Sequence, residues 1–192
     1  MAIFLSASIP YGKRAKEFVP DPVAIREAVR SLVMVMSPTQ DIVFGGHPAI
    51  NPFVLDAARS LGTMDRIHIF QSEYFKEHIP CEVFYFKKIL WTPQKEGQEE
   101  SLLRMRNEMM NPEHYHIPPY LAAFFIGGMN GVIDEWKLFR DKYPEKPCFP
   151  LASTEGAARK LVENGLIGSR EWDDETRYHH LFSEILKKIT VS

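Results

Sequence analysis

The alternation of short apolar runs with longer amphipathic segments constrains this 192-residue chain more than any other feature. The runs at residues 2–8, 41–44 and 121–126 are almost continuously apolar, which is typical of strands buried on both faces of a parallel sheet. Between such runs apolar residues recur at helical spacing, for example after Asp21-Pro22, a helix start signal. This alternation predicts a Rossmann-like, doubly wound α/β fold, with a mainly parallel sheet of about five strands and helices on both faces.

The same patterns place the individual elements. We expect strands at residues 2–8, 41–44, 66–70, 121–126 and 148–151. Helices are expected at about 22–36, 52–61, 99–110 and 132–139, and two further helices close the chain. Residues 74–91 are predicted to form an extended loop with a short strand near 83–86. Because no linker or internal repeat interrupts the pattern, residues 1–192 are predicted to form a single domain.

The last predicted helix carries a continuous apolar stripe. Its members are Tyr178, Leu181, Phe182, Ile185, Leu186 and Ile189. Together with an exposed aromatic side chain at Trp91, this stripe favours self-association, so a homo-oligomer is expected.

Composition and charge narrow the class of protein. With 45% hydrophobic and 25% charged residues the chain is typical of globular proteins, and its net charge of −2 disfavours a nonspecific nucleic-acid binder. The two cysteines, Cys81 and Cys148, lie in no metal-ligand pattern and are predicted to be buried, reduced thiols. The sequence contains neither a membrane-helix pattern nor a secretion-signal pattern. A cytoplasmic protein with no membrane partner is therefore expected.

The residues that follow the predicted strands are the candidates for ligand binding. In an open α/β sheet the ligand lies beyond the carboxyl ends of the strands, near the point where strand order reverses. Glycines and hydroxyl side chains recur there, and although each glycine pair could be only a tight turn, their convergence predicts N–H groups and hydroxyls facing an anion. The candidates are Ser6, Ser8, Gly45, Gly46, His47, Gln71, Ser72, Gly127, Gly128, Met129, Gly131, Ser153 and Thr154.

Arg106 is the most informative charged residue. On a helical wheel Leu102, Met105 and Met109 define one face, and Arg106 falls within it, whereas Arg104 points to the opposite side. A guanidinium in a core-facing stripe needs an anionic partner, because burying an unpaired charge is costly. That partner is either a ligand phosphate or Glu135, unless the side chain extends along the edge of the helix to solvent.

Residues 127–135, Gly-Gly-Met-Asn-Gly-Val-Ile-Asp-Glu, resemble the glycine-rich signature of the SLOG superfamily, which includes the Lonely Guy phosphoribohydrolases and DprA-like proteins. In the hydrolases the motif reads PGGxGTxxE and follows an arginine helix of the form RxxxM, which Arg106 to Met110 matches. Residues 6–10 and 44–48 further resemble SLOG modules linked to prokaryotic TIR-type defence systems. The resemblance implies a Rossmann-like nucleotide-binding domain.

The resemblance implies two principal functions. The first is a sensor of an NAD-derived nucleotide, such as ADP-ribose or cyclic ADP-ribose, in prokaryotic antiviral signalling. In such a sensor Arg106 would bind the pyrophosphate and Glu135 the ribose hydroxyls. The alternative is a nucleotide N-glycosidase, in which Arg106 and Glu135 would be catalytic. Asn130 makes the loop one residue longer than in the hydrolase motif and Val132 replaces its threonine, which favours binding over turnover.

Partners and cofactors follow from these interpretations. The absence of a net basic charge disfavours a DprA-like nucleic-acid protein. No histidine has acidic or cysteine partners at ligand spacing, so neither a metal nor a cofactor is predicted. A small-molecule nucleotide is the expected partner, and any protein that reads the bound state is left open.

Overall fold

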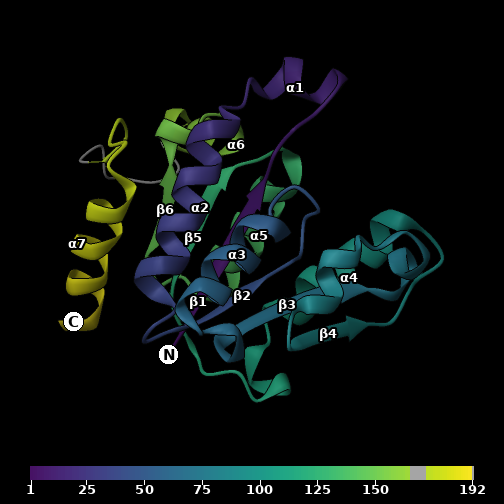
Figure 1. Cartoon of the computed structure of the whole chain (residues 1–192). Coiled ribbons are helices and arrows are strands. Elements are labelled where there is room, and N and C mark those ends of the chain that lie inside the picture. The colour runs from purple at the N-terminus through teal and green to yellow at the C-terminus, as the bar shows by residue number, and fades with distance from the viewer. Residues whose placement is uncertain (165–171, 192) are drawn as a thin grey trace.

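The computed structural model describes residues 1–164 and 172–191 (Figure 1). The strands are β1 (Ala2–Ser8), β2 (Asp41–Phe44), β3 (Ile67–Ser72), β4 (Lys88–Thr92), β5 (Tyr120–Gly127) and β6 (Cys148–Leu151). The α-helices are α1 (Lys13–Phe18), α2 (Pro22–Met36), α3 (Asn51–Leu61), α4 (Gln98–Met109), α5 (Asn130–Lys142), α6 (Gly156–Glu163) and α7 (Tyr178–Val191). Short 3-10 helices lie at Met64–Arg66, Glu73–His78, Cys81–Tyr85, Pro112–Tyr115 and Ala152–Thr154.

The six strands form one parallel sheet in the order β4-β3-β2-β1-β5-β6. From β1 the chain first builds outward through β2 and β3 to β4, and then crosses back to place β5 on the other side of β1. The switch point of this doubly wound sheet therefore lies between β1 and β5. The structure confirms the predicted α/β fold with its parallel sheet, which has six strands.

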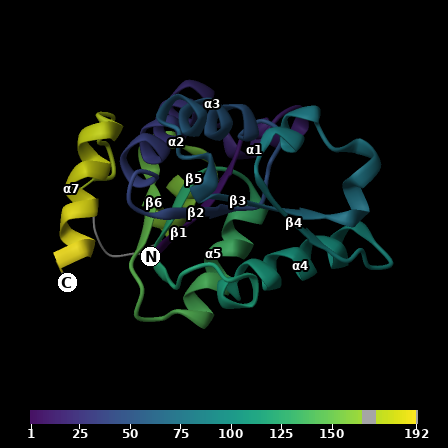
Figure 2. The ribbon, with the colours of Figure 1, turned by 60° about the horizontal axis from the view of Figure 1, so that its bottom comes forward.

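The helices cover both faces of the sheet. Figure 2 shows α2 and α3 on one side and α4 and α5 on the other. Alternate residues of β1 enter the two cores: Ile3 and Leu5 pack with α2 and α3, whereas Ala2 and Phe4 pack with α4 and α5. Since Ser6 continues the second set, its side chain points toward α4 and α5.

Strand β4 corrects the interpretation of residues 74–91. The predicted strand near 83–86 is wrong, because residues 81–85 form a 3-10 helix and β4 begins only at Lys88. Val83 and Phe86 are buried while Phe84 and Tyr85 are exposed. This spacing of three residues fits a helical turn and does not fit strand alternation.

Trp91 and the cysteines also differ from expectation. Trp91 lies in the edge strand β4 and is half-buried, with the Lys76 Nζ 5.6 Å from the centre of its ring, so it is not a fully exposed aromatic. Cys81 is exposed and Cys148 is half-buried, and both are free thiols. The prediction of two buried thiols is therefore wrong for Cys81.

The apolar stripe of α7 is used within the chain. Helix α7 lies beside α2 (Figure 1), and Tyr178, Leu181, Phe182 and Ile185 are buried in the core on that side of the sheet. These side chains are therefore unavailable for the self-association that the stripe suggested. No helix among residues 1–164 and 172–191 combines the length and the apolar character needed to cross a membrane.

Candidate functional site

Two glycine-rich loops lie at the carboxyl edge of the sheet. Residues 45–48 follow β2 and are called here the GGHP loop, and residues 127–131 connect β5 to α5 and are called the GGMNG loop. Because β1 lies between β2 and β5, the end of β1 with Ser6 and Ser8 lies between the two loops. Ser8 is in register with Gly127. The two loops therefore flank the switch point, where ligands of such sheets bind.

The GGMNG loop is packed closely against its neighbours. Gly127 has φ +58°, and a Cβ atom there would lie 2.3 Å from Ile25 Cδ1 and 3.2 Å from the Ser8 carbonyl oxygen. The Gly127 N–H donates to Thr154 Oγ1 at 2.8 Å, and Thr154 Oγ1 donates to the Leu151 carbonyl at 2.6 Å. Glycine is therefore required at 127 for steric reasons, and Thr154 holds the end of β5 in place.

Arg106 of α4 contacts the other end of this loop. Its side chain is 16% exposed, compared with 42% for Arg104, in agreement with the helical wheel. A Cβ atom at Gly131 would lie 2.6 Å from Arg106 Nη2, so the missing side chain at 131 leaves room for the guanidinium. This contact brings α4 to the first turn of α5, although the two residues lie far apart in the sequence.

Two carboxylates pair with this guanidinium. Arg106 Nε lies 3.4 Å from Glu135 Oε1, and Nη1 lies 3.5 Å from Asp134 Oδ2. Both distances exceed the ~2.8 Å of a strong charge-assisted hydrogen bond. Of the two partners foreseen for Arg106, the structure therefore places the carboxylate of Glu135 beside it, in a loose pair that an anion could replace.

Glu135 occupies a position with little solvent. Its side chain is 14% exposed, and burial raises the pKa of its carboxyl, while Arg106 and the Ser6 hydroxyl act to lower it. The Ser6 hydroxyl is buried and makes no hydrogen bond of good geometry with any residue that the structure describes. Ser6, Arg106 and Glu135 thus form a small polar cluster on the α4 and α5 side of the switch point.

The GGHP loop has different neighbours. Gly46 has φ +62°, and a Cβ atom there would lie 1.8 Å from Gln71 Nε2 and 2.8 Å from Ile69 Cδ1. The Gln71 amide donates to the Gly46 carbonyl at 3.2 Å and to the Gly45 carbonyl at 3.4 Å. Gln71 therefore holds the GGHP loop from the neighbouring strand β3, and its amide N–H groups already donate to backbone carbonyls.

Helix α4 links the two loops. A Cβ atom at Gly45 would lie 3.4 Å from the methyl carbons of Met105 and Met109, which is ordinary contact. The same helix presents Arg106 to Gly131. His47 continues the GGHP loop, and its Nδ1 accepts a hydrogen bond from the Ala49 N–H at 3.2 Å. One helix thus contacts both glycine loops.

Two hydroxyl residues predicted for the site have other partners. Ser72 Oγ accepts from the Tyr74 N–H at 3.3 Å and begins the 3-10 helix that follows β3. Ser153 Oγ donates to the Glu175 carbonyl at 2.9 Å and lies 3.1 Å from the Tyr178 hydroxyl. Ser153 therefore connects the end of β6 to the start of α7, away from Arg106.

The predicted residues thus divide into two groups. Those gathered around the switch point are Ser6, Ser8, Gly45, Gly46, His47, Arg106, Gly127, Gly128, Met129, Gly131 and Glu135. Those that mainly support the surrounding loops are Gln71, Ser72, Ser153 and Thr154.

Two features of this edge of the sheet were not predicted from the sequence. Glu155 has φ 58° and ψ −161°, a conformation that favours glycine, and a Cβ atom at Gly156 would lie 2.8 Å from the Gly128 carbonyl oxygen. The Ala157 N–H donates to that oxygen at 3.1 Å, so the start of α6 holds the GGMNG loop.

The second feature is Asn51, the first residue of α3, which is fully buried. A polar residue in an otherwise apolar helix stripe was the signal for Asn51.

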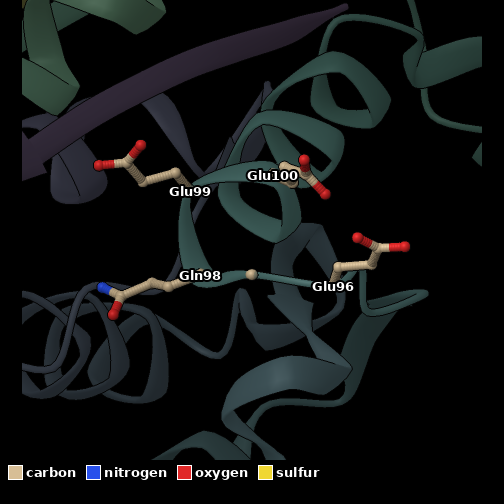
Figure 3. A pocket seen from close by; sticks show the side chains of 5 residues that line it. Glu96, Gln98, Glu99 and Glu100 are labelled. Carbon is tan, nitrogen blue, oxygen red and sulfur yellow. The ribbon is translucent and has the colours of Figure 1, made fainter.

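A shallow depression lies elsewhere, at the start of α4. It is lined by residues 96–100, and Figure 3 shows the side chains of Gln98 and Glu99 directed away from those of Glu96 and Glu100. The acidic groups do not converge on a common point. In the described part of the chain, no three His, Cys, Asp or Glu side chains are grouped so as to hold a metal ion.

Known proteins resemble this chain in fold and in family pattern. A solved X-ray structure of the protein TM1055, a structural genomics target, has a TM-score of 0.54 with this chain and covers 85% of it. The match spans 81% of that protein at 14% identity, so it shows the fold alone. No curated protein is significantly similar in sequence.

The family comparison is more specific. The SLOG cluster3 family model matches residues 17–186, which include the GGHP loop, Arg106 and the GGMNG loop. This match confirms the resemblance to the SLOG superfamily that the glycine motif suggested. The chain belongs to the SLOG cluster3 family.

Proposed function

We propose that this protein binds an ADP-ribose-like nucleotide at the switch point and acts as a sensor of that nucleotide. Membership of a SLOG family indicates a nucleotide-related or ribose-processing function. The observation that carries the finer proposal is Arg106, which is nearly buried between Gly131 and two loosely paired carboxylates. A guanidinium with such partners is suited to exchange them for a pyrophosphate, because Arg binds phosphate oxygens through a planar fork of donors.

The surrounding residues have consistent roles in this proposal. Backbone amides of Gly45, Gly46 and Gly128 would contact the pyrophosphate, whereas the Gly127 N–H, also expected there, already donates to Thr154. Side chains would bind the rest of the ligand. Ser6, Ser8 and Glu135 would bind ribose hydroxyls, and His47 or Met129 would pack against a sugar or base. A place in prokaryotic antiviral signalling is part of the same proposal and depends on the resemblance of residues 6–10 and 44–48 to TIR-linked modules.

Calorimetric titration with ADP-ribose tests the proposal, with chromatography of each mixture after incubation. We expect saturable binding with the nucleotide recovered intact, and a loss of about thirtyfold in affinity in Arg106→Met, since hydrogen bonds to charged groups contribute ~2 kcal/mol. Arg104→Met is the matched control, because Arg104 lies on the same helix and pairs with Glu108. This control should keep the native affinity, and an equal loss in both variants would contradict the proposal.

A second function is favoured by one observation. The raised pKa of the buried Glu135 carboxyl, beside a cationic group, is a property of general acids in enzymes that cleave glycosidic bonds. In that case chromatography would show a free base released from AMP or NAD, and Glu135→Gln would abolish its release. Such a result would replace the sensor by an N-glycosidase.

A further inference from the structure

Asn51 carries a buried amide that is unusual for its position. The residue opens α3 and has no exposed surface. Neither Nδ2 nor Oδ1 has a hydrogen-bond partner in residues 1–164 and 172–191. A buried amide that lacks partners destabilises a fold substantially, so native structures rarely contain one without a further reason.

The direction of this side chain follows from the helix. The buried residues of α3 are Asn51, Val54, Leu55, Ala57 and Ala58, so the core-facing stripe begins with an amide and is otherwise apolar. Helical side chains tilt toward the helix N-terminus. The N-terminus of α3 adjoins the GGHP loop, as the bond from the Asn51 N–H to the His47 carbonyl at 3.0 Å shows. The amide therefore lies near the carboxyl edge of β2.

We infer that Asn51 binds the adenine of the nucleotide and so selects a 6-aminopurine ligand. This inference rests on the proposed function and assigns the part of the ligand that the Arg106 cluster leaves unbound. A carboxamide offers one acceptor and two donors in a plane, which matches the amino group and adjacent ring nitrogen of adenine. Such bidentate pairs are the standard way in which Asn recognises adenine.

One nucleotide can reach both groups. β2 and β5 are each neighbours of β1, so with strands ~4.8 Å apart the two loops are about 10 Å apart along the edge. Arg106 lies on the α4 side of the sheet and Asn51 on the α3 side. The phosphates would therefore lie at the GGMNG loop, and the base would cross the edge of β1 to the GGHP loop.

Binding requires the GGHP loop to shift, since the amide has no exposed surface. Hydrogen bonds of 3.2 Å and 3.4 Å from Gln71 support this loop, and neither is short. The surroundings of the amide also suit a base better than a phosphate, because the rest of the buried α3 stripe is apolar and belongs to the core that α2 and α3 share. The phosphate and base positions are thus served by different residues.

The test titrates native protein, Asn51→Leu and Asn51→Ala with three probes: adenosine, purine riboside and ribose 5-phosphate. Leu has the same branched skeleton as Asn without its polar atoms, and Ala covers the case in which Leu fails to fold. Gln40→Met is the matched control, because Gln40 is also buried with an unpaired amide oxygen among the described residues, but it precedes β2 at the opposite edge.

We expect native protein to bind adenosine at least about tenfold more tightly than purine riboside, which lacks the amino group. Asn51→Leu should remove this preference and should leave ribose 5-phosphate binding unchanged, while Gln40→Met keeps both. Melting temperature should rise in Asn51→Leu, because an unpaired amide is removed.

Other results separate the two proposals. An adenosine preference that persists in both Asn51 variants overturns the assignment of Asn51, whatever happens at Arg106. Failure of ribose 5-phosphate to bind, or binding that is unchanged in Arg106→Met, overturns the phosphate site but leaves an adenosine effect of Asn51 visible. Failure of native protein to distinguish adenosine from purine riboside also overturns the inference.

Discussion

The GGHP loop and the GGMNG loop share a pattern in the sequence but meet different neighbours in the fold. The GGHP loop contacts the uncharged side chains of Gln71, Ile69 and the α4 methionines. The GGMNG loop adjoins the Arg106 guanidinium and, through it, the buried carboxylate of Glu135. A glycine pair after a strand therefore identifies a place where atoms approach closely, while the neighbouring side chains decide which chemistry that place supports.

The largest expected effect concerns stability and compares the loops directly. Gly127→Ala should reduce the free energy of unfolding by about 3 kcal/mol, because its Cβ meets both Ile25 and the Ser8 backbone at positive φ. Gly46→Ala should cost less, since the atoms nearest to its Cβ would belong to side chains, those of Gln71 and Ile69, and not to the backbone. Gly62 has φ +69°, and a Cβ added there would meet no atom of the described chain within 4 Å beyond its own chain neighbours. Gly62→Ala therefore measures the cost of positive φ alone, about 1 kcal/mol. Urea unfolding checks this order, and equal losses would mean that the two loops are packed alike.

The next effect concerns ligand affinity. Gly131→Ala places a Cβ 2.6 Å from Arg106 Nη2 and should displace the guanidinium, with about a tenfold loss of ADP-ribose affinity. The free energy of unfolding should change little, because Ala is favoured over Gly within a helix by ~1 kcal/mol, and this gain offsets the cost of displacing the guanidinium. Gly45→Ala, where the added carbon makes ordinary contacts, is the comparison variant in calorimetry. A larger affinity loss in Gly45→Ala than in Gly131→Ala would reverse the roles of the loops.

A smaller effect is expected from pH. Arg106 is the main group that lowers the pKa of Glu135. A phosphate that pairs with Arg106 in place of Glu135 would raise this pKa, so the buried carboxyl should take up a proton when the nucleotide binds. Affinity should therefore increase as pH falls, by at most about tenfold per pH unit for one proton. Calorimetry in buffers of different ionisation enthalpy measures this uptake, and Glu135→Gln should abolish it. Proton release on binding would contradict the exchange of partners at Arg106.

The smallest effect lies far from both loops. His68 of β3 is buried, its Nε2 lies 2.7 Å from Asp41 Oδ2, and burial lowers its pKa below 6.5. The folded state therefore favours neutral His68, and this contribution to stability is present above pH 6.5 and lost as pH falls through the lowered pKa. Lowering the pH from about 7.5 to about 5.5 should reduce the free energy of unfolding more in the native protein than in His68→Gln, and urea unfolding at both pH values measures this difference. A response of nucleotide affinity to this substitution would show that pH effects at the two ends of the sheet are coupled.

Much of the fold could be predicted because the buried strands are apolar runs and the helices have clear periods. The prediction was wrong at residues 83–86, since only two buried side chains, Val83 and Phe86, mark the helical turn in this short segment. The site could be placed at the strand ends, and the inward direction of Arg106 followed from the helical wheel. The roles of Gln71 and Ser153 could not be predicted, because their partners lie on elements 22 or more residues away.

The α/β class, the positions of both glycine loops and the resemblance to the SLOG superfamily could be read from the sequence, since these depend on local periodicity and on contiguous motifs. The folded molecule alone shows the strand order, the pairing of Arg106 with Glu135 and Asp134, and the lack of hydrogen-bond partners for the Asn51 amide among the described residues. These features depend on tertiary contacts, because burial and charge pairing are set by which elements become neighbours. Segments far apart along the chain, such as α4 and the GGMNG loop, acquire their shared chemistry only when the sheet brings them together.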